Sequence, residues 1–244
     1  SYGYLQVTAG KLIKRKLVVR WRRVMSLLQR EGLRVVNAID IGANVGDTPL
    51  IMALAGVSGR VVAFEMLPRN FQVLRFFLEL NPWLKIDAHN YAVGPSDGGA
   101  CVNDGFGNGM VRSCYDIAGA IPMREPVSFL NKTYGDQFLH EIGFIKIDTE
   151  GGDKDVLRWI KPILDISQPV VQVEWFEPHR KCRPGGKNGY SMETLYLFEA
   201  VASIGYVSLH PSSLSEIDIS STVCNFEAAP LDLVLIPKVF FLKV

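Results

Sequence analysis

Apolar residues follow two alternating patterns along the chain from residue 35 onward. Short continuous apolar runs predict buried strands near 35–41, 61–65, 85–93, 142–148, 169–175, 204–210 and 232–238. Stretches with apolar positions three and four residues apart predict helices over 46–56, 68–80, 152–161 and 191–203. Alternation of this kind over short linkers predicts an α/β domain with a mostly parallel sheet and helices on both faces. The last strand follows a turn-rich segment, so it is free to insert antiparallel.

The first 34 residues have a different pattern. Apolar residues recur there at spacings of four, four, three and four, which is typical of an amphipathic helix, at Ile13, Leu17, Trp21, Val24 and Leu28. Residues 11–34 also hold nine basic residues and one acid. We therefore expect a basic helical extension over 1–34 and a separate domain over 35–244. We expect the cationic face to be solvated, with peripheral contact to a membrane or to another anionic surface as the alternative.

Composition narrows the function classes. The chain has 244 residues, 48% of them hydrophobic, and a net charge of +1, so it is long enough for one globular domain and gives no argument for nucleic-acid binding. Four widely spaced cysteines without a C-x-x-C pair favour free thiols in a reducing compartment, with a disulfide as the alternative. The compartment is left open, with the cytoplasm as the default. No apolar run approaches the roughly 18 residues of a membrane span.

The most informative segment is the first predicted strand and the turn after it. The strand is interrupted by one acid, Asp40, and stops at Gly42, and a helical pattern begins at Gly46. A buried strand, a tight turn and a helix in this order place the helix N-terminus toward a ligand. Glu65 ends the next predicted strand, where a carboxylate can accept hydrogen bonds from both hydroxyls of a ribose. Together the two segments predict a nucleoside-containing cofactor.

Details of the turn favour one cofactor. Sites for dinucleotides usually read G-x-G-x-x-G, but here Asn44 replaces the middle glycine and Asp40 would repel phosphate. The turn therefore suits S-adenosylmethionine (SAM), whose amino acid part carries an ammonium and a sulfonium. We expect contacts with SAM from Asp40, Gly42, Ala43, Asn44, Gly46, Asp47 and Thr48 in the turn and helix start, from Glu65 at the ribose, and from Met66, Asn90 and Ala92 around the adenine.

Four segments of the chain resemble the FkbM family of SAM-dependent methyltransferases. They are Asp40–Asp47, Val62–Asn70, Phe144–Gly151 and Val171–Glu174, within a match over roughly 35–240. The resemblance implies the Rossmann-like fold of class I methyltransferases, a seven-stranded sheet with a reversed last strand. It also implies methyl transfer, usually to a hydroxyl oxygen, here of a small molecule or saccharide. The segments that would shape the acceptor pocket, 106–137 and the loop after Glu174, match poorly.

Two acids follow the fourth predicted strand, Asp148 and Glu150. Strand alternation would point both side chains the same way, so that one could bind the SAM amino group and the other could orient or deprotonate the acceptor hydroxyl. The alternative is that they cap the next helix. His179, in a basic loop after the fifth strand, is a third candidate base. Lys146 lies deeper in the same strand and needs an acidic partner, for which Asp40 and Glu174 are the candidates.

Several expectations concern the surroundings of this site. Two long segments, 94–141 and 176–190, should border the cleft as loops, because ligands bind beyond the carboxyl ends of parallel strands. The acids could also gather around a divalent metal, but we expect none. One competing hypothesis is an NAD(P)-dependent oxidoreductase, but the sequence has no tyrosine–lysine catalytic pair to support it. The other is a non-catalytic scaffold that binds SAM or its demethylated product, S-adenosylhomocysteine (SAH). The oligomeric state is left open.

Overall fold

A computed structural model describes residues 35–102, 111–113, 120–174, 192–210, 213, 215–216 and 232–241. The basic extension predicted over 1–34 and the candidate base His179 lie outside these residues. The description below is therefore confined to the predicted domain.

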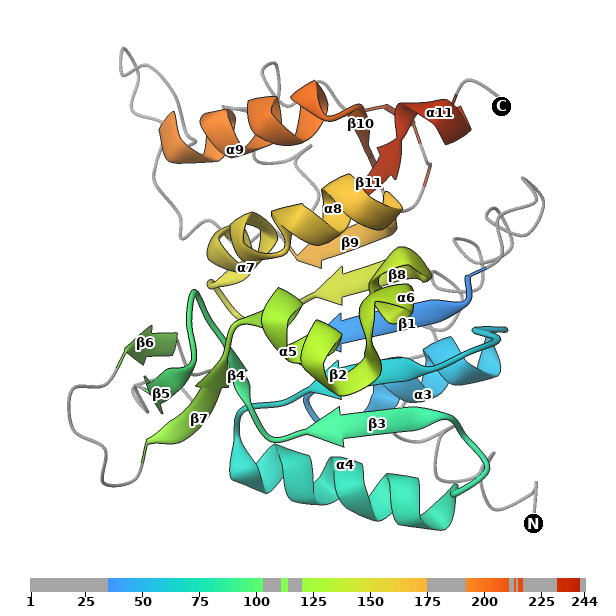
Figure 1. The fold of residues 1–244 in the computed structure, drawn as a ribbon, viewed down its shortest axis with the longest axis vertical. Coiled ribbons are helices and arrows are strands. Elements are labelled where there is room, and N and C mark those ends of the chain that lie inside the picture. The colour runs from blue at the N-terminus through green and yellow to red at the C-terminus, as the bar shows by residue number, and fades with distance from the viewer. Residues whose placement is uncertain are drawn as a thin grey trace.

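A seven-stranded sheet forms the centre of the domain (Figure 1). Its strands, in spatial order, are β10 (Tyr206–Leu209), β11 (Asp232–Pro237), β9 (Val170–Glu174), β8 (Ile142–Ile147), β1 (Asn37–Ile41), β2 (Val61–Phe64) and β3 (Ile86–His89). All neighbouring pairs are parallel except those of β11, which runs antiparallel to both β10 and β9. The predicted fold class, a mostly parallel sheet with a reversed last strand, is confirmed.

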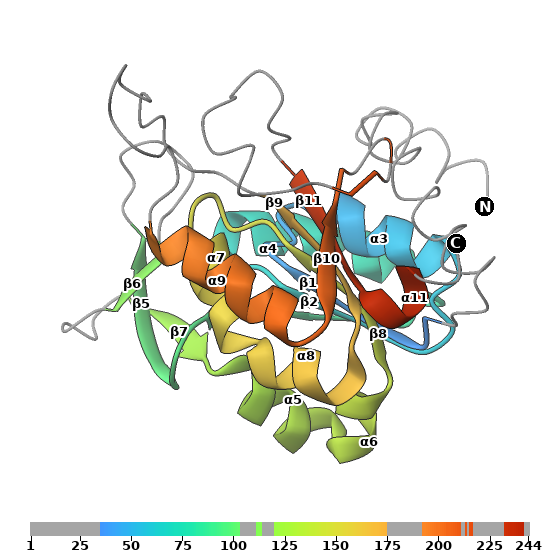
Figure 2. The same cartoon turned by 90° about the horizontal axis from the view of Figure 1, so that it is seen from above.

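Helices cover both faces of this sheet (Figures 1 and 2). One face packs against α3 (Asp47–Leu54), α4 (Pro68–Leu80) and α11 (Lys238–Phe241). The other face packs against α5 (Pro126–Tyr134), α6 (Asp136–His140), α7 (Asp153–Trp159), α8 (Lys161–Ser167) and α9 (Met192–Ser203). The central strands are apolar on both faces, as buried parallel strands require: Ile39 and Ile41 belong to one core cluster and Ala38 to the other. Asp40 and Lys146 are charged exceptions within these strands.

A second, four-stranded sheet lies beside the first. It consists of β4 (Ala92–Val93), β7 (Ile121–Arg124), β5 (Gly98–Val102) and β6 (Val111–Ser113), in that order. The strand predicted over 85–93 is therefore two strands, and β4 belongs to the small sheet. The prediction of a long loop over 94–141 is wrong for its described residues, which form β5, β6, β7, α5 and α6. Cys101 in β5 is disulfide-bonded, contrary to the expectation of free thiols.

Proline and a carboxylate explain two helix boundaries that the sequence analysis missed. The side chain of Glu125 accepts hydrogen bonds from the backbone N–H groups of Val127 and Ser128, so it caps α5, whose first residue is Pro126. The helix predicted over 152–161 stops early, at Trp159, and α8 starts at Lys161 with a proline in its first turn. No helix in the described part of the chain is long and apolar enough to cross a membrane.

Candidate functional site

The turn between β1 and α3 is held by contacts with the ends of two neighbouring strands. The backbone N–H groups of Gly42 and Ala43 donate to the carbonyl of Phe64 at the end of β2, at 3.0 and 2.9 Å. Gly42 has a φ of 87°, and a Cβ atom there would lie 1.8 Å from the carbonyl oxygen of Asp148. A side chain is therefore excluded at this position by the protein's own backbone after β8. Asn44 also adopts a left-handed conformation, with a φ of 51°.

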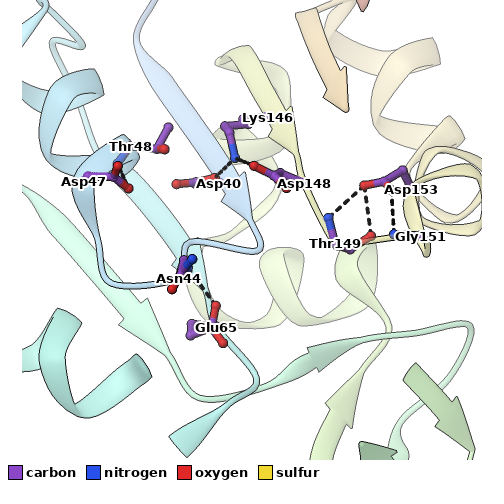
Figure 3. A network of polar contacts seen from close by, with 10 residues as sticks. All are labelled: Asp40, Asn44, Asp47, Thr48, Glu65, Lys146, Asp148, Thr149, Gly151 and Asp153. Atoms are coloured by element: carbon purple, nitrogen blue, oxygen red, sulfur yellow. Dashed lines mark hydrogen bonds and ion pairs between the residues drawn. The ribbon is translucent and has the colours of Figure 1, made fainter. Parts of the chain in front are cut away.

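Glu65 joins this turn to the end of β2 (Figure 3). Its Oε2 accepts a hydrogen bond from the backbone N–H of Asn44 at 2.7 Å, and its Oε1 accepts one from Leu67 at 2.8 Å. Burial raises the pKa of the Glu65 carboxyl, while these two hydrogen bonds oppose the rise. The side chain of Asn70 donates a third hydrogen bond to this carboxylate, so one of its four lone pairs remains. Glu65 thus orders the turn and still has acceptor capacity for a ligand hydroxyl.

Asn90 fixes the other side of the same corner. Its Nδ2 donates to the backbone carbonyls of Glu65 and Met66, at 2.8 and 3.0 Å. Asn90 lies in the two-residue gap between β3 and β4, so it ties the start of the small sheet to the end of β2. Its role in this structure is to hold the backbone on which Glu65 and Met66 are presented.

Asp153, which the sequence analysis did not single out, organises the loop after β8. Its buried carboxylate accepts hydrogen bonds from the backbone N–H and the hydroxyl of Thr149, at 2.7 and 3.0 Å, and from the N–H of Gly151 at 3.1 Å (Figure 3). Burial raises the pKa of Asp153, and these hydrogen bonds oppose the rise. The N-cap residue of α7 is Gly152, which has no side chain to cap the helix. Neither Asp148 nor Glu150 is the N-cap residue, and the alternative that they cap this helix in another way stays a prediction.

A buried lysine connects two of the predicted site acids. The Nζ of Lys146 lies 2.7 Å from Oδ2 of Asp148 and 3.8 Å from Oδ1 of Asp40 (Figure 3). Burial raises the pKa of Asp40 to about 7, against the opposing effect of Lys146. Burial works against the charged form of Asp148 as well, but the ammonium group holds the pKa of Asp148 below its ordinary value. The predicted pairing of Lys146 with Asp40 is confirmed, and Asp148 is its nearer partner.

A pocket of about 930 Å³, counting its open mouth, lies beyond the carboxyl ends of β1, β2 and β8. Seven of the predicted site residues line it: Gly42, Asn44, Glu65, Met66, Ala92, Asp148 and Glu150. Six others do not: Asp40, Ala43, Gly46, Asp47, Thr48 and Asn90. Asp40 is completely buried below the pocket, and the carboxylate of Asp47 accepts the N–H of Thr48 at the start of α3. Contacts between these six residues and a cofactor stay predictions.

The pocket also has a wall that sequence reasoning did not identify. Asp155, Val156 and Trp159 of α7 line it, as does Asn70 of α4. No local pattern marks these residues, because they reach the pocket through the packing of α7 and α4 against the strand ends. The described residues of 94–141 contribute nothing to the lining, so the prediction that this segment borders the cleft is wrong for them. The second predicted loop, 176–190, lies outside the described residues.

Three acids converge at one side of this pocket. Carboxylate oxygens of Asp148, Glu150 and Glu174 lie within 4.8 Å of one another. Strand alternation does not explain the convergence, because β8 ends at Ile147 and Glu150 has a φ of 55°. The loop that Asp153 holds turns Glu150 back toward Asp148 instead. Such a group of carboxylates favours a cationic ligand and can accept a proton. Its oxygens also suit a divalent cation, although we predicted none.

Comparisons with known proteins agree with this arrangement. The methyltransferase FkbM domain matches residues 40–207, which is more than half of the chain. A search of curated proteins gave no match. Among solved structures, the chain is similar to methyltransferase FkbM from Methylobacillus flagellatus, with 16% identity, a TM-score of 0.49 and coverage of 83% of this chain and 44% of that one. The chain thus spans less than half the length of that protein.

Another similar structure is the O-methyltransferase from Bacillus cereus in complex with SAH, with 14% identity and a TM-score of 0.49. The similarity covers 96% of this chain and 88% of that one. The domain match carries the assignment: it begins at Asp40, before the turn at the pocket, and it includes Glu65, Asp148, Glu150 and Glu174. The chain belongs to the family of proteins with a methyltransferase FkbM domain.

Proposed function

We propose that the protein transfers a methyl group from SAM to a hydroxyl oxygen of a small molecule or saccharide. The observation that carries the proposal is the composition of a single pocket. One half of its lining is the glycine turn with Glu65, which suits an adenosine, and the other half contains Asp148 and Glu150, which suit the cationic amino acid part of SAM.

The charge of the lining favours SAM over a dinucleotide. Four acids line the pocket, and none of its described lining residues is basic: the acids are Glu65, Asp148, Glu150 and Asp155. Lys146 pairs with Asp148 and Arg158 pairs with Asp155, but neither cation lines the pocket. A pyrophosphate bound there would face acids and no basic residue of the described lining, whereas the ammonium and sulfonium of SAM would meet opposite charge. This argument weighs against the oxidoreductase hypothesis.

The chain's own residues would fit SAM as follows. The remaining lone pair of Glu65 accepts one ribose hydroxyl, and the second hydroxyl takes the place of the hydrogen bond from Asn70. Met66, which packs beside Ala92 and Met123, offers an apolar surface to the adenine. Asp148 or Glu150 accepts hydrogen bonds from the ammonium. When bound, SAM supplies an electrophilic methyl group on sulfur.

The acceptor side has to orient a hydroxyl and remove its proton. Alignment of two reacting groups can supply roughly 7–11 kcal/mol. Lys146 restrains Asp148, so Asp148 offers an ionised carboxylate in a defined orientation, and the exposed Glu150 lies close by. One of these two acids accepts the proton of the hydroxyl while the other binds the cofactor. His179 is kept as a further candidate base.

A screen of acceptors tests the proposal. The full chain is incubated with SAM labelled on its methyl group and with panels of hydroxylated metabolites, saccharides and matched amines. We expect label to pass to a hydroxyl compound and not to its amine analogue. Failure of every acceptor, together with no binding of SAM or SAH, would contradict methyl transfer.

A pair of variants separates the two roles of the acids. Asp148→Asn should reduce turnover while the affinity for SAM stays within about tenfold, a change of roughly 1.4 kcal/mol. Asp165→Asn is the matched control, because Asp165 pairs with Lys161 on the surface of α8, away from the pocket, and it should change neither quantity. A collapse of SAM affinity in Asp148→Asn would assign Asp148 to the cofactor and not to the acceptor.

A further inference from the structure

Three polar residues lie side by side on one face of the central sheet, directly below the pocket. The strand register pairs Asp40 of β1 with Lys146 of β8, and Lys146 with Gln172 of β9. All three are buried, and the side chain of Lys146 is only 6% exposed. A charged group in such a place loses its hydration and needs compensation from its neighbours.

The compensation that Lys146 receives is unequal. Its Nζ is within hydrogen-bond distance of Asp148, which lines the pocket, at 2.7 Å. Its distance to Asp40, at 3.8 Å, allows an ion pair but no hydrogen bond. Neither carboxylate oxygen of Asp40 has a hydrogen-bond partner among the described residues. One ammonium group is therefore shared by two acids, of which one faces the ligand and the other is enclosed.

We propose that Lys146 is a positioning residue, which fixes the direction and the charge of the Asp148 carboxylate in the pocket. This inference rests on the proposed function, since Asp148 matters to catalysis only if the pocket binds SAM and an acceptor. Asp148 follows the end of β8, where its backbone N–H donates to the carbonyl of Ile41 at 3.0 Å, but its side chain is 34% exposed and is not enclosed by the sheet. The bond to Lys146 restrains this side chain from inside the sheet.

Asp40 modulates this restraint. Asp40 is fully buried, and no described residue donates a hydrogen bond to its carboxylate. Burial therefore favours its protonated form and raises the pKa of Asp40 to about 7. When Asp40 is protonated, the ammonium group of Lys146 interacts with only one negative charge, that of Asp148. When Asp40 is ionised, both carboxylates attract this ammonium group.

Other acids surround the cluster and enter the same balance. Asp47 of α3 raises the pKa of both Asp40 and Lys146, and Glu65, which follows β2, raises the pKa of Asp40. Glu174 at the end of β9 hydrogen-bonds to Asp148, which requires a proton shared between the two carboxyl groups. Burial opposes the charged form of Lys146, but Asp40, Asp148 and Asp47 raise its pKa, so the lysine is expected to stay protonated throughout the neutral range.

A purely structural ion pair is the competing explanation. It predicts that removal of Lys146 lowers stability and leaves the pocket unchanged. The proposal predicts that the ligand-facing acid itself changes. Two readouts distinguish them: the titration of the Asp148 side chain, followed by carbon-13 NMR of labelled aspartate and assigned with Asp148→Asn, and the pH dependence of SAH binding, followed by calorimetry.

The variants are Lys146→Met, Lys146→Arg and, as a matched control, Lys161→Met, which removes a lysine–aspartate pair of 2.8 Å on the surface of α8. In Lys146→Met we expect Asp148 to titrate at higher pH and the acid limb of SAH binding to move with it. Lys146→Arg should restore both, at least in part, because it keeps the charge. Lys161→Met should move neither.

Two outcomes would overturn the proposal. One is a folded Lys146→Met protein in which Asp148 titrates, and SAH binds, as in the wild type. The other concerns Asp40→Asn, which is used if Lys146→Met does not fold. The proposal requires that Asp40→Asn abolishes the change in the NMR signal of Asp148 near pH 7. A signal that still changes there as in the wild type would contradict the sharing of the Lys146 ammonium group between Asp40 and Asp148. Absence of SAH binding in the wild type would refute the proposed function instead, while the titration of Asp148 would still report on Lys146.

Discussion

Replacement of Gly42 by alanine tests the contact that closes the turn onto the strand beside it. The residue has a φ of 87°, and the new Cβ would lie 1.8 Å from the carbonyl oxygen of Asp148. A left-handed conformation costs an L-residue about 1–2 kcal/mol, and relief of an overpacked contact adds about 1–3 kcal/mol. We expect the free energy of unfolding to fall by about 2–5 kcal/mol.

For a chain of this size such a loss lowers Tm by roughly 4–20 °C. The backbone at Asp148 or the turn must also move, so the affinity for SAH should fall more than about tenfold, or 1.4 kcal/mol. The stability is measured by urea denaturation and by thermal melting, and the affinity by calorimetry below the melting transition.

Gly205→Ala is the matched control for this variant. Gly205, in the turn between α9 and β10, has nearly the same φ, 89°, but no atom lies within 4 Å of an added Cβ. It should lose only the conformational part, about 1–2 kcal/mol, and bind SAH as the wild type does. Equal losses in both variants would refute the close contact. Unchanged SAH affinity in a destabilised Gly42→Ala protein would show that the turn does not form the ligand site.

Three further predictions follow from the same geometry. Asp153→Ala removes the acceptor for Thr149 and Gly151, so the free energy of unfolding should fall by about 2–4 kcal/mol and the affinity for SAH should fall too. Asp153→Asn should keep part of both. The result that contradicts this is urea denaturation that detects no loss of stability in the alanine variant. In the folded protein Asp40 keeps its proton up to about pH 7, whereas in the unfolded chain it loses the proton near pH 3.8. Between these two pH values the folded state binds more protons than the unfolded state. The free energy of unfolding should therefore fall as the pH rises from 3.8 to about 7. Asp40→Asn should remove that fall, which is at most about 4 kcal/mol, and a wild-type pH slope in this variant would be the contrary result. Finally, EDTA and added Mg²⁺ should leave SAH affinity unchanged, since we predict no metal; a dependence on Mg²⁺ would show that the three converging acids hold a cation.

The parts of the fold that the sequence predicted are those that local patterns determine. Buried strands show as apolar runs, so all seven strands of the large sheet were predicted, although the run over 85–93 covers both β3 and β4. The turn at Gly42 follows from two glycines at a fixed spacing. The reversal of β11 was implied by the family resemblance, because the local pattern left the direction of this strand open. The small sheet was not predicted. Its β5 begins with Gly98 and Gly99, which have little strand propensity, and it forms through pairing with β7 more than twenty residues away.

The site shows the same division. Glu65 lies beside the turn because β1 and β2 are neighbours, which the strand–turn–helix pattern implies. The complete burial of Asp40 was not predictable. The strand–turn–helix pattern places Asp40 one residue before the pocket, but it does not show that Lys146 would lie against its carboxylate. Val156 and Trp159 of α7 reach the pocket only through tertiary packing, so no spacing in the sequence indicates them.

The most direct test of the account is the affinity of the purified full chain for SAH, compared with NADH and with the Glu65→Gln variant. We predict saturable binding of one SAH per chain, no measurable binding of NADH, and an affinity at least about tenfold lower in Glu65→Gln, because the amide nitrogen of glutamine cannot accept the hydrogen bonds that the carboxylate receives. A folded wild-type protein that binds NADH and not SAH, or a Glu65→Gln variant that binds SAH as tightly as the wild type, would contradict the assignment of this pocket to SAM.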